Sequence, residues 1–192
     1  MLLFVTGAVR SGKSSYAEKR AIDYVKAVGG SLHYIATSQV EDEEMKKRID
    51  LHQQTRKKSN VSWMVYEQPY DLQNLLPRFQ QKDVVLIDCL TTLLNNEMFR
   101  EWQKGEDYIL NKCYLNTIYE KLAEMLSSYA HGPWTTIVVS NEIGEGLPHT
   151  EKGTMAYLAL LGKLHQWAVQ LADEAILVEY GIPILKKGVS QE

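Results

Sequence analysis

Cysteine is scarce in this sequence, and its placement excludes a small disulfide-stabilised domain. The two cysteines, Cys89 and Cys113, have neither the CxxC spacing of a zinc or redox motif nor the pattern of a disulfide framework. No apolar run approaches the roughly 18 residues that a membrane span needs. The apolar run 2–5 is short and has no basic segment before it, unlike a secretion signal. We therefore expect a cytoplasmic protein in a reducing compartment.

The sequence also lacks a cluster of Lys and Arg that would mark a nucleic-acid-binding surface. Its 21 Lys and Arg are outnumbered by 24 Asp and Glu, and the densest basic stretch, 56–58, is balanced by the acidic stretch 41–44. Polyanions are therefore not expected as main partners. There is no internal repeat, low-complexity tract or interdomain linker, so 192 residues with 45% hydrophobic content predict one domain, 1–192, with a proper core.

A complete phosphate-binding motif follows the first apolar run. The motif G-x-x-x-x-G-K-[ST] is formed by Gly7, Ala8, Val9, Arg10, Ser11, Gly12, Lys13 and Ser14. In such a loop the backbone N–H groups turn toward the phosphates, the lysine reaches the β- and γ-phosphate oxygens, and the last hydroxyl can hold Mg²⁺. The predicted ligand is a nucleoside triphosphate. The alternative is a glycine-rich turn that binds nothing.

Short β-branched runs alternate with longer helical patterns, which is typical of an α/β protein with a mostly parallel sheet flanked by helices. The predicted strands are 2–6, 31–36, 61–67, 84–88, 136–140, 175–179 and a short edge strand 183–185. The first predicted helix begins at Ser14, and further helices are predicted over 41–56, 90–102, 107–129 and 152–171. The runs 84–87 and 137–139 are continuously apolar and should be central strands. The irregular segment 143–153 is a candidate mobile loop over the site.

Two acidic positions follow apolar strands and should open on the same edge of the sheet as the phosphate loop. Asp88 has the form of a Walker B acid, which can hold Mg²⁺ directly or through water. The same side chain could instead cap the helix that begins at Leu90. Asn141 and Glu142 end the strand 136–140, and either Asp88 or Glu142 could accept the proton of a substrate hydroxyl.

The predicted helix 41–56 stacks Arg48, His52 and Arg56 on one stripe by i, i+4, i+8 spacing. Two flanking cations lower the pKa of an imidazole, which keeps it neutral and nucleophilic near pH 7. The stripe would suit formation of a histidine–nucleotide phosphoramidate; the alternative is a solvated surface histidine. The remaining histidines have no such setting and no zinc spacing, and we interpret them as structural or surface residues: His33, His131, His149 and His165.

The order of motifs resembles the bifunctional adenosylcobinamide kinase / adenosylcobinamide-phosphate guanylyltransferase family. The blocks are G-x-x-R-S-G-K-S, Y-I-A-T-S-Q, D-E-E-M-x-x-R-I-x-x-H-x-x-x-R, W-x-x-x-E, I-D-C-L-T-T, S-N-E-I-G-x-G and a closing A-D-E-A-I-L-V-x-x-G-I-P. The resemblance implies phosphorylation of the aminopropanol hydroxyl of adenosylcobinamide, then transfer of GMP from GTP through a covalent histidine. It also implies a RecA-like P-loop fold and a homotrimer.

Carried over to this chain, the resemblance makes His52 the guanylylated residue, beside Lys13 in catalysis. GTP, ATP and Mg²⁺ are the expected cofactors, with Ser14 and Asp88 at the metal and a corrinoid as substrate; the nucleotide of the kinase step stays open. The implied nucleotide contacts are Gly7, Ala8, Val9, Arg10, Ser11, Gly12, Lys13, Ser14, Ala36, Thr37, Ser38, Gln53, Gln54, Thr55, Arg56, Glu67 and Asp88.

The sequence departs from the family pattern on the substrate side. Tyr157, Leu158 and Ala159 stand where relatives usually carry an aromatic-Arg-Asp element, and His165 stands where they carry an Asn. Three alternatives to the family function remain. A kinase of another small molecule would have no use for His52, and a non-catalytic nucleotide-binding protein would turn nothing over. A regulatory GTPase would carry Asn-Lys-x-Asp where this chain reads Asn-Glu-Ile-Gly.

Overall fold

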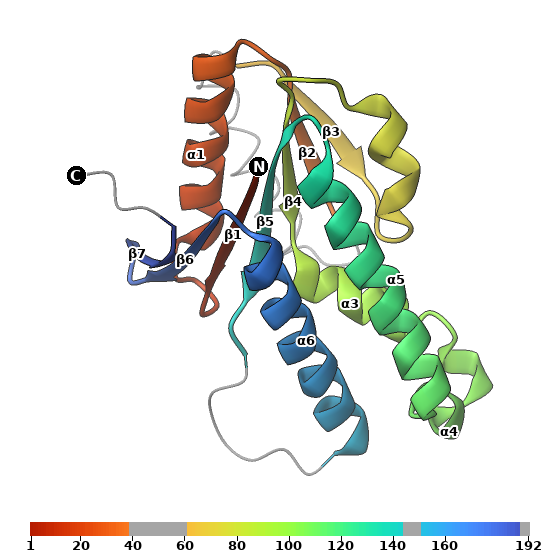
Figure 1. The fold of residues 1–192 in the computed structure, drawn as a ribbon. Helices are drawn as coiled ribbons and strands as arrows, with labels where there is room; N and C mark the ends of the chain where they lie inside the picture. Colours follow the sequence, from red (N-terminus) through yellow and green to blue (C-terminus); the bar gives the residue numbers. More distant parts are fainter. Residues whose placement is uncertain (39–60, 144–150, 189–192) are drawn as a thin grey trace.

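The computed structural model describes residues 1–38, 61–143 and 151–188 (Figure 1). The helix expected over 41–56 and most of the segment 143–153 lie outside the described residues. Within the described part the strands form one seven-stranded sheet, with helices against both of its faces. No described helix has both the length and the apolar character to cross a bilayer.

The strands and helices follow the predicted alternation. The strands are β1 (Leu2–Gly7), β2 (Leu32–Ala36), β3 (Trp63–Glu67), β4 (Val84–Asp88), β5 (Thr135–Asn141), β6 (Glu174–Glu179) and β7 (Ile182–Lys187). The α-helices are α1 (Lys13–Val28), α3 (Leu90–Phe99), α4 (Glu106–Ile109), α5 (Lys112–His131) and α6 (Lys152–Leu171), with 3₁₀ turns η1 (Leu72–Arg78) and η2 (Trp102–Lys104).

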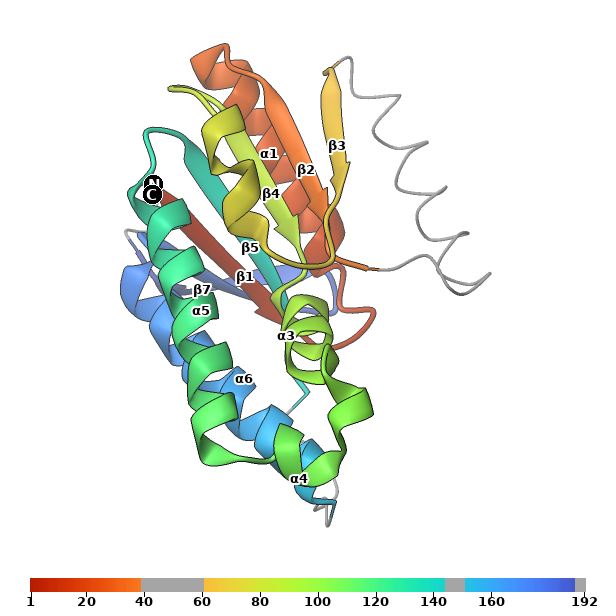
Figure 2. The same ribbon diagram turned by 90° about the vertical axis from the view of Figure 1, so that its right-hand side faces the viewer.

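The sheet has the strand order β3-β2-β4-β5-β1-β6-β7. Every neighbouring pair is parallel except β6 and β7, which form an antiparallel hairpin at one edge. The continuously apolar strands β4 and β5 lie in the interior, as predicted, because both of their faces are covered. The prediction of an α/β fold with a mostly parallel sheet is confirmed (Figure 2).

Each face of the sheet has its own hydrophobic core. On one face, Ala17, Ala21 and Val25 of α1 pack against alternate residues of the strands, such as Leu3 and Val5. On the other face α3, α5, α6 and η1 cover the intervening strand residues, which include Leu2, Phe4, Val85, Ile87 and Val138. Figure 1 shows α1 alone on its side of the sheet and the other helices on the opposite side. The period-2 alternation of the strands thus supplies both cores.

Two helices differ from their expected bounds. The helix expected over 90–102 ends at Phe99, and the one expected over 107–129 is divided into α4 and α5. The Asn111 side chain accepts a hydrogen bond of 2.8 Å from Cys113 N and so caps α5, which explains the break. Nothing in the sequence pattern indicates η1, which contains Pro77.

Candidate active site

The loop at residues 8–12 joins β1 to α1 and closes on itself. Ser11 N donates to Ala8 O at 3.1 Å, and the Lys13 ammonium donates to the same carbonyl oxygen at 3.1 Å. Arg10 and Gly12 both have positive φ angles, 63° and 91°. Left-handed residues in a tight loop turn neighbouring N–H groups to one side, which is the geometry of a backbone anion nest.

Gly7 and Gly12 are required by this shape. A Cβ at Gly7 would lie 2.3 Å from the carbonyl oxygen of Val178 and 2.6 Å from Ser11 Oγ, closer than any side chain is tolerated. Gly12 has its left-handed φ at the N-cap position of α1, where a Cβ is disfavoured. The fold itself therefore requires glycine at both positions of the motif, whether or not a ligand is bound.

The turn between β6 and β7 supports the loop from the outside. Gly181 N donates to Ser11 O at 2.8 Å, and a Cβ at Gly12 would lie 3.3 Å from Gly181 Cα. This contact joins residues about 170 positions apart in the chain. Sequence analysis missed it, because the signal available, a glycine between β-type runs, indicates a turn but does not say what the turn touches.

Lys13 and Ser11 are buried within the loop, with 6% and 7% of their surface exposed. A lysine is rarely this buried unless its ammonium is bonded, and here it reaches Ala8 O. The Ser11 hydroxyl is buried with no hydrogen-bond partner among the described residues. Buried hydroxyls without partners are uncommon in proteins, so the Ser11 hydroxyl is available to bond a ligand in the loop.

Asp88 ends β4 at the same edge of the sheet as the loop. In the strand register it lies beside Ala36 of β2, and Ala36 in turn lies beside Glu67 of β3. The Tyr34 hydroxyl donates to Asp88 Oδ2 at 3.1 Å, which orients the carboxylate. Three predicted site residues from three strands therefore gather here, as the parallel pairing requires, because ligand sites of open α/β sheets form at the carboxyl ends of the strands.

Thr37 links β2 to the residue after Asp88. Its Oγ1 accepts from Cys89 N at 2.8 Å and donates to Cys89 O at 2.9 Å, while Asn96 of α3 donates to Thr37 O at 2.7 Å. Burial raises the pKa of the Cys89 thiol, so this cysteine stays protonated and is not a nucleophile. Ser38 is the last described residue of this segment.

Ser14 and Asp88 are the predicted metal residues. Ser14 is the second residue of α1, directly after Lys13, and Asp88 ends β4. Among the described residues there is no group of three His, Cys, Asp or Glu side chains that could hold a metal ion by themselves. A magnesium ion bound with a nucleotide needs no such group, since it takes one hydroxyl, one carboxylate, phosphate oxygens and waters. The donor types at Ser14 and Asp88 fit that requirement.

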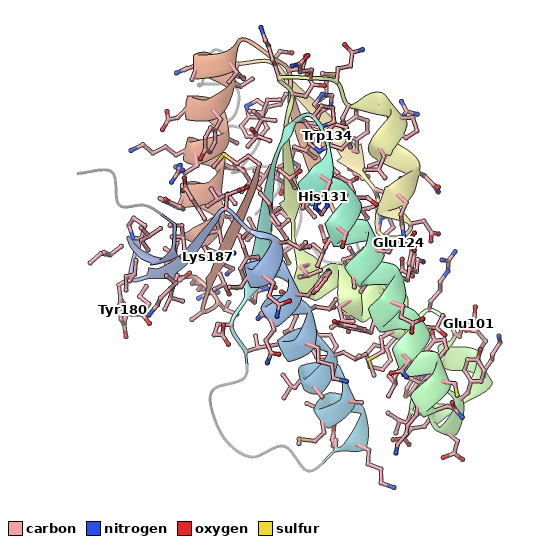
Figure 3. The ribbon with its side chains drawn as sticks, in the orientation of Figure 1. Glu101, Glu124, His131, Trp134, Tyr180 and Lys187 are labelled. Atoms are coloured by element: carbon pink, nitrogen blue, oxygen red, sulfur yellow. The ribbon has the colours of Figure 1, made fainter. Side chains whose placement is uncertain are left out.

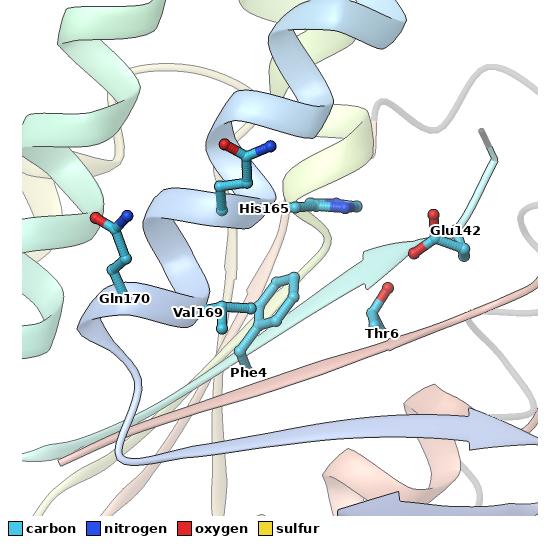
Figure 4. A pocket seen from close by; sticks show the side chains of 7 residues that line it. Phe4, Thr6, Glu142, His165, Val169 and Gln170 are labelled. Atoms are coloured by element: carbon cyan, nitrogen blue, oxygen red, sulfur yellow. The ribbon is translucent and has the colours of Figure 1, made fainter. Parts of the chain in front are cut away.

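A cavity of about 400 Å³ lies between β1 and α6 beside the loop (Figure 4). Its lining includes Phe4 and Thr6 of β1, Glu142, and His165 of α6. Glu142 N donates to Gly7 O at 2.9 Å, which joins the cavity to the start of the phosphate loop. The Thr6 hydroxyl is buried with no hydrogen-bond partner among the described residues. Figure 4 shows Thr6 and His165 near Glu142, with Gln170 at the far end.

A chain of polar side chains leads from the cavity into the protein. His165 Nε2 lies 2.7 Å from Ser140 Oγ, which lies 3.0 Å from Thr91 Oγ1. Thr91 Oγ1 also accepts from Asn141 N at 2.7 Å. Burial lowers the pKa of His165 to about 4, so the ring is neutral at physiological pH. Sequence analysis gave no role to Thr91 and Ser140, because a small polar residue within an apolar run carries no signal of its partner.

Comparison with known proteins identifies the family. Residues 3–185 match the family described as Cobinamide kinase / cobinamide phosphate guanyltransferase. The chain belongs to this family. It is 30% identical over 186 residues to "Bifunctional adenosylcobalamin biosynthesis protein CobU" of Escherichia coli (strain K12), covering 96% of this chain and 98% of that protein. It is 31% identical over 188 residues to "Bifunctional adenosylcobalamin biosynthesis protein CobP" of Pseudomonas aeruginosa, covering 96% of each.

Membership in the cobinamide kinase / guanyltransferase family confirms the resemblance that the motifs indicated, and it agrees with the P-loop fold. Within this family member the structure brings together the phosphate loop, Ala36, Thr37, Glu67 and Asp88 at one sheet edge. The other predicted site residues lie outside the described residues and remain predictions: His52, Gln53, Gln54, Thr55 and Arg56.

Proposed function

We propose that this protein phosphorylates adenosylcobinamide and then transfers GMP from GTP to adenosylcobinamide phosphate, in assembly of the nucleotide loop of cobalamin. The observation that carries the proposal is the phosphate loop on a parallel sheet, with Asp88 on the same edge, in a chain that matches its family over residues 3–185. The printed names of the curated relatives describe bifunctional proteins of adenosylcobalamin biosynthesis.

GTP, ATP and Mg²⁺ are the cofactors of this proposal. Ser14 and Asp88 would hold Mg²⁺, which neutralises charge on the phosphates when bound. The Lys13 ammonium donates to Ala8 O across the loop, and from this position it can reach the β- and γ-phosphate oxygens of a bound nucleotide. Positioning and charge neutralisation supply most of the catalysis in phosphoryl transfer, and both are properties of a rigid loop.

For guanylyl transfer, a ring nitrogen of neutral His52 attacks the α-phosphorus of GTP. The bond from that phosphorus to the bridging oxygen breaks, and pyrophosphate leaves. A phosphate oxygen of adenosylcobinamide phosphate then attacks the phosphoramidate, which releases the imidazole and forms the diphosphate linkage. The support for His52 is its spacing between Arg48 and Arg56 together with the family motif D-E-E-M-x-x-R-I-x-x-H.

The test of this proposal is covalent labelling with GTP that carries radioactive phosphorus at the α position. The protein should acquire acid-labile label, and His52→Ala should acquire none while still phosphorylating adenosylcobinamide. His131→Ala is the matched control, because His131 is an exposed histidine on α5, bonded to Ser127 O. Absence of label on the unaltered protein would overturn the transferase assignment and favour a kinase of another small molecule. Binding without any turnover would favour a non-catalytic protein.

In the kinase step, the phosphate loop presents the γ-phosphate to the hydroxyl of the substrate. Asp88 and Glu142, both at this edge, are the carboxylates that the sequence indicated for taking the proton. Asp88 Oδ2 already accepts from Tyr34, whereas the Glu142 side chain lines the cavity beside Gly7.

We infer further that the protein works in the cytoplasm as a homotrimer, on the support of the resemblance. Light scattering should then give three times the 22.0 kDa of one chain.

A further inference from the structure

The turn between β6 and β7 has an aromatic residue where its backbone disfavours one. Glu179 pairs with Ile182, so the turn has two central residues, Tyr180 and Gly181. Their φ angles are 51° and 81°, both positive, as a type I′ turn requires. Asn or Asp followed by Gly is the preferred sequence for this turn, and a bulky residue with positive φ is an outlier. Local stability therefore does not explain the tyrosine.

Packing does not explain Tyr180 either. Its side chain is 97% exposed, so it contributes nothing to either core. Figure 3 shows it at the outer end of the β6–β7 hairpin. A large ring that is both conformationally costly and fully in water indicates a functional role, because strained positions cluster at binding sites.

The position of the turn indicates what the ring serves. Gly181 N donates to Ser11 O at 2.8 Å, and Gly181 Cα would lie 3.3 Å from a Cβ at Gly12. Tyr180 is thus attached directly to the part of the phosphate loop that leads into α1. The contact fixes the backbone of the turn on the loop, so the Cα of Tyr180 has a defined place relative to any bound phosphate chain.

The direction of a bound triphosphate follows from Lys13. Its ammonium lies 3.1 Å from Ala8 O, near the beginning of the loop, and this group serves the β- and γ-phosphates. The α-phosphate then lies toward Gly12 and the first residues of α1. Gly12 lies against Gly181, so a nucleoside attached to an α-phosphate at this end of the loop would leave it beside the β6–β7 turn. Tyr180 is a central residue of that turn.

We propose that Tyr180 is the surface on which the purine base of the bound triphosphate stacks. The inference rests on the proposed function, since it requires a nucleotide on the phosphate loop. A phenol ring offers an apolar face to any purine, so Tyr180 contributes to the affinity for GTP and ATP alike. Because the backbone of the turn is already bonded to the loop, only the side-chain torsions of Tyr180 have to be ordered when the base binds.

The test uses a substitution that the turn itself favours. Tyr180→Asn removes the ring but creates the Asn-Gly pair preferred by type I′ turns, so the melting temperature should stay the same or rise. Titration calorimetry with Mg²⁺ should show that the affinity for GTP and for ATP falls roughly tenfold or more, by the usual contribution of base stacking. The affinity for inorganic tripolyphosphate should not change, and Tyr180→Phe should bind GTP like the unaltered protein.

Tyr108→Asn is the matched control, because it removes another exposed tyrosine, on α4, far from the hairpin in Figure 1. Equal GTP affinity in the unaltered protein and Tyr180→Asn would overturn the stacking role while leaving the proposed function intact. An equal loss of affinity for tripolyphosphate would also overturn it, since the ring would then act on the loop. If the unaltered protein bound no GTP, the proposed function itself would fail.

Discussion

His165 shows how surroundings decide the chemistry of one residue. Its ring lies against Phe4, with centroids 5.4 Å apart, and its Nε2 is bonded to Ser140 Oγ. Burial removes water from the ring, so the charged form is disfavoured and the pKa falls from 6.5 to about 4. The neutral imidazole is hydrogen-bonded to the Ser140 hydroxyl near the carboxyl end of β5, and that hydroxyl is in turn bonded to the hydroxyl of Thr91 on α3.

The lowered pKa of His165 predicts an acid-dependent loss of stability. Between pH 6.5 and 4 the unfolded chain binds a proton at this residue and the folded protein does not, so the free energy of unfolding falls as the pH falls. His165→Asn keeps a polar partner for Ser140 but cannot titrate. Urea unfolding at pH 7 and pH 4.5 should show that the unaltered protein loses roughly 2 kcal/mol more than the variant.

Other titrating groups also have lowered pKa values. Burial lowers the pKa of His33, and the hydrogen bond from Lys121 lowers the pKa of Asp71. They are present in both proteins, so their effects cancel in the comparison. An equal loss of stability in the two proteins between these pH values would contradict the prediction and place the His165 ring in contact with water.

At the scale of elements, the end of β1 and the middle of α6 place opposite demands on glycine. Gly7 has no room for a side chain, whereas Gly162 is exposed within α6 and has nothing within 4 Å of an added Cβ. Glycine in a helix interior costs stability because it restricts the unfolded chain least. The same residue type is therefore required at one position and unfavourable at the other.

Two matched substitutions test this contrast. Gly7→Ala should lower the free energy of unfolding by about 1–3 kcal/mol, because the new methyl group meets Val178 O, and should weaken nucleotide binding by moving the loop. Gly162→Ala should raise it by about 0.5–1 kcal/mol without an effect on binding. Chemical denaturation and GTP titration measure both. Normal stability and binding in Gly7→Ala would show that the loop geometry described here is wrong.

At the scale of the whole molecule, a charged cluster fastens three elements of the helical face. Lys121 of α5 donates to Glu97 Oε2 of α3 at 2.7 Å and also to Asp71, which precedes η1. The Asp71 backbone N–H donates to Glu97 Oε1 at 3.1 Å. Glu97 is 2% exposed, so its carboxylate oxygens are hydrogen-bonded to these partners in place of water. The cluster adds charged hydrogen bonds to the apolar packing that already joins η1, α3 and α5.

Removing the lysine should therefore be costly. Lys121→Met leaves the buried Glu97 carboxylate with only the more distant cation of Arg100, 3.9 Å away, and the free energy of unfolding should fall by roughly 3 kcal/mol. Lys104→Met is the matched control, since Lys104 pairs with Glu101 in solvent and should cost at most about 0.5 kcal/mol. Urea denaturation compares them. Equal effects of the two substitutions would mean that the Glu97 side chain is hydrated in solution.

Much of this site could be predicted from the sequence because its signals are local. The phosphate motif, the apolar strands and Asp88 each occupy a few consecutive residues, and parallel pairing then brings their ends to one edge. Helix ends were harder. Asn111 divides a continuous periodic pattern, since a side-chain cap competes with helix continuation on nearly equal terms. The placement of His52 relative to the loop stays a prediction.

The sequence by itself determined the fold class and the phosphate loop, because periodicity and glycine placement act through backbone geometry over short distances. Only the tertiary structure decided which distant residues complete the site. The bond from Gly181 to Ser11, the bond from Glu142 to Gly7 and the setting of His165 each join segments that no local pattern connects. Such contacts arise when the strands take their order in the sheet, which is a property of the whole chain.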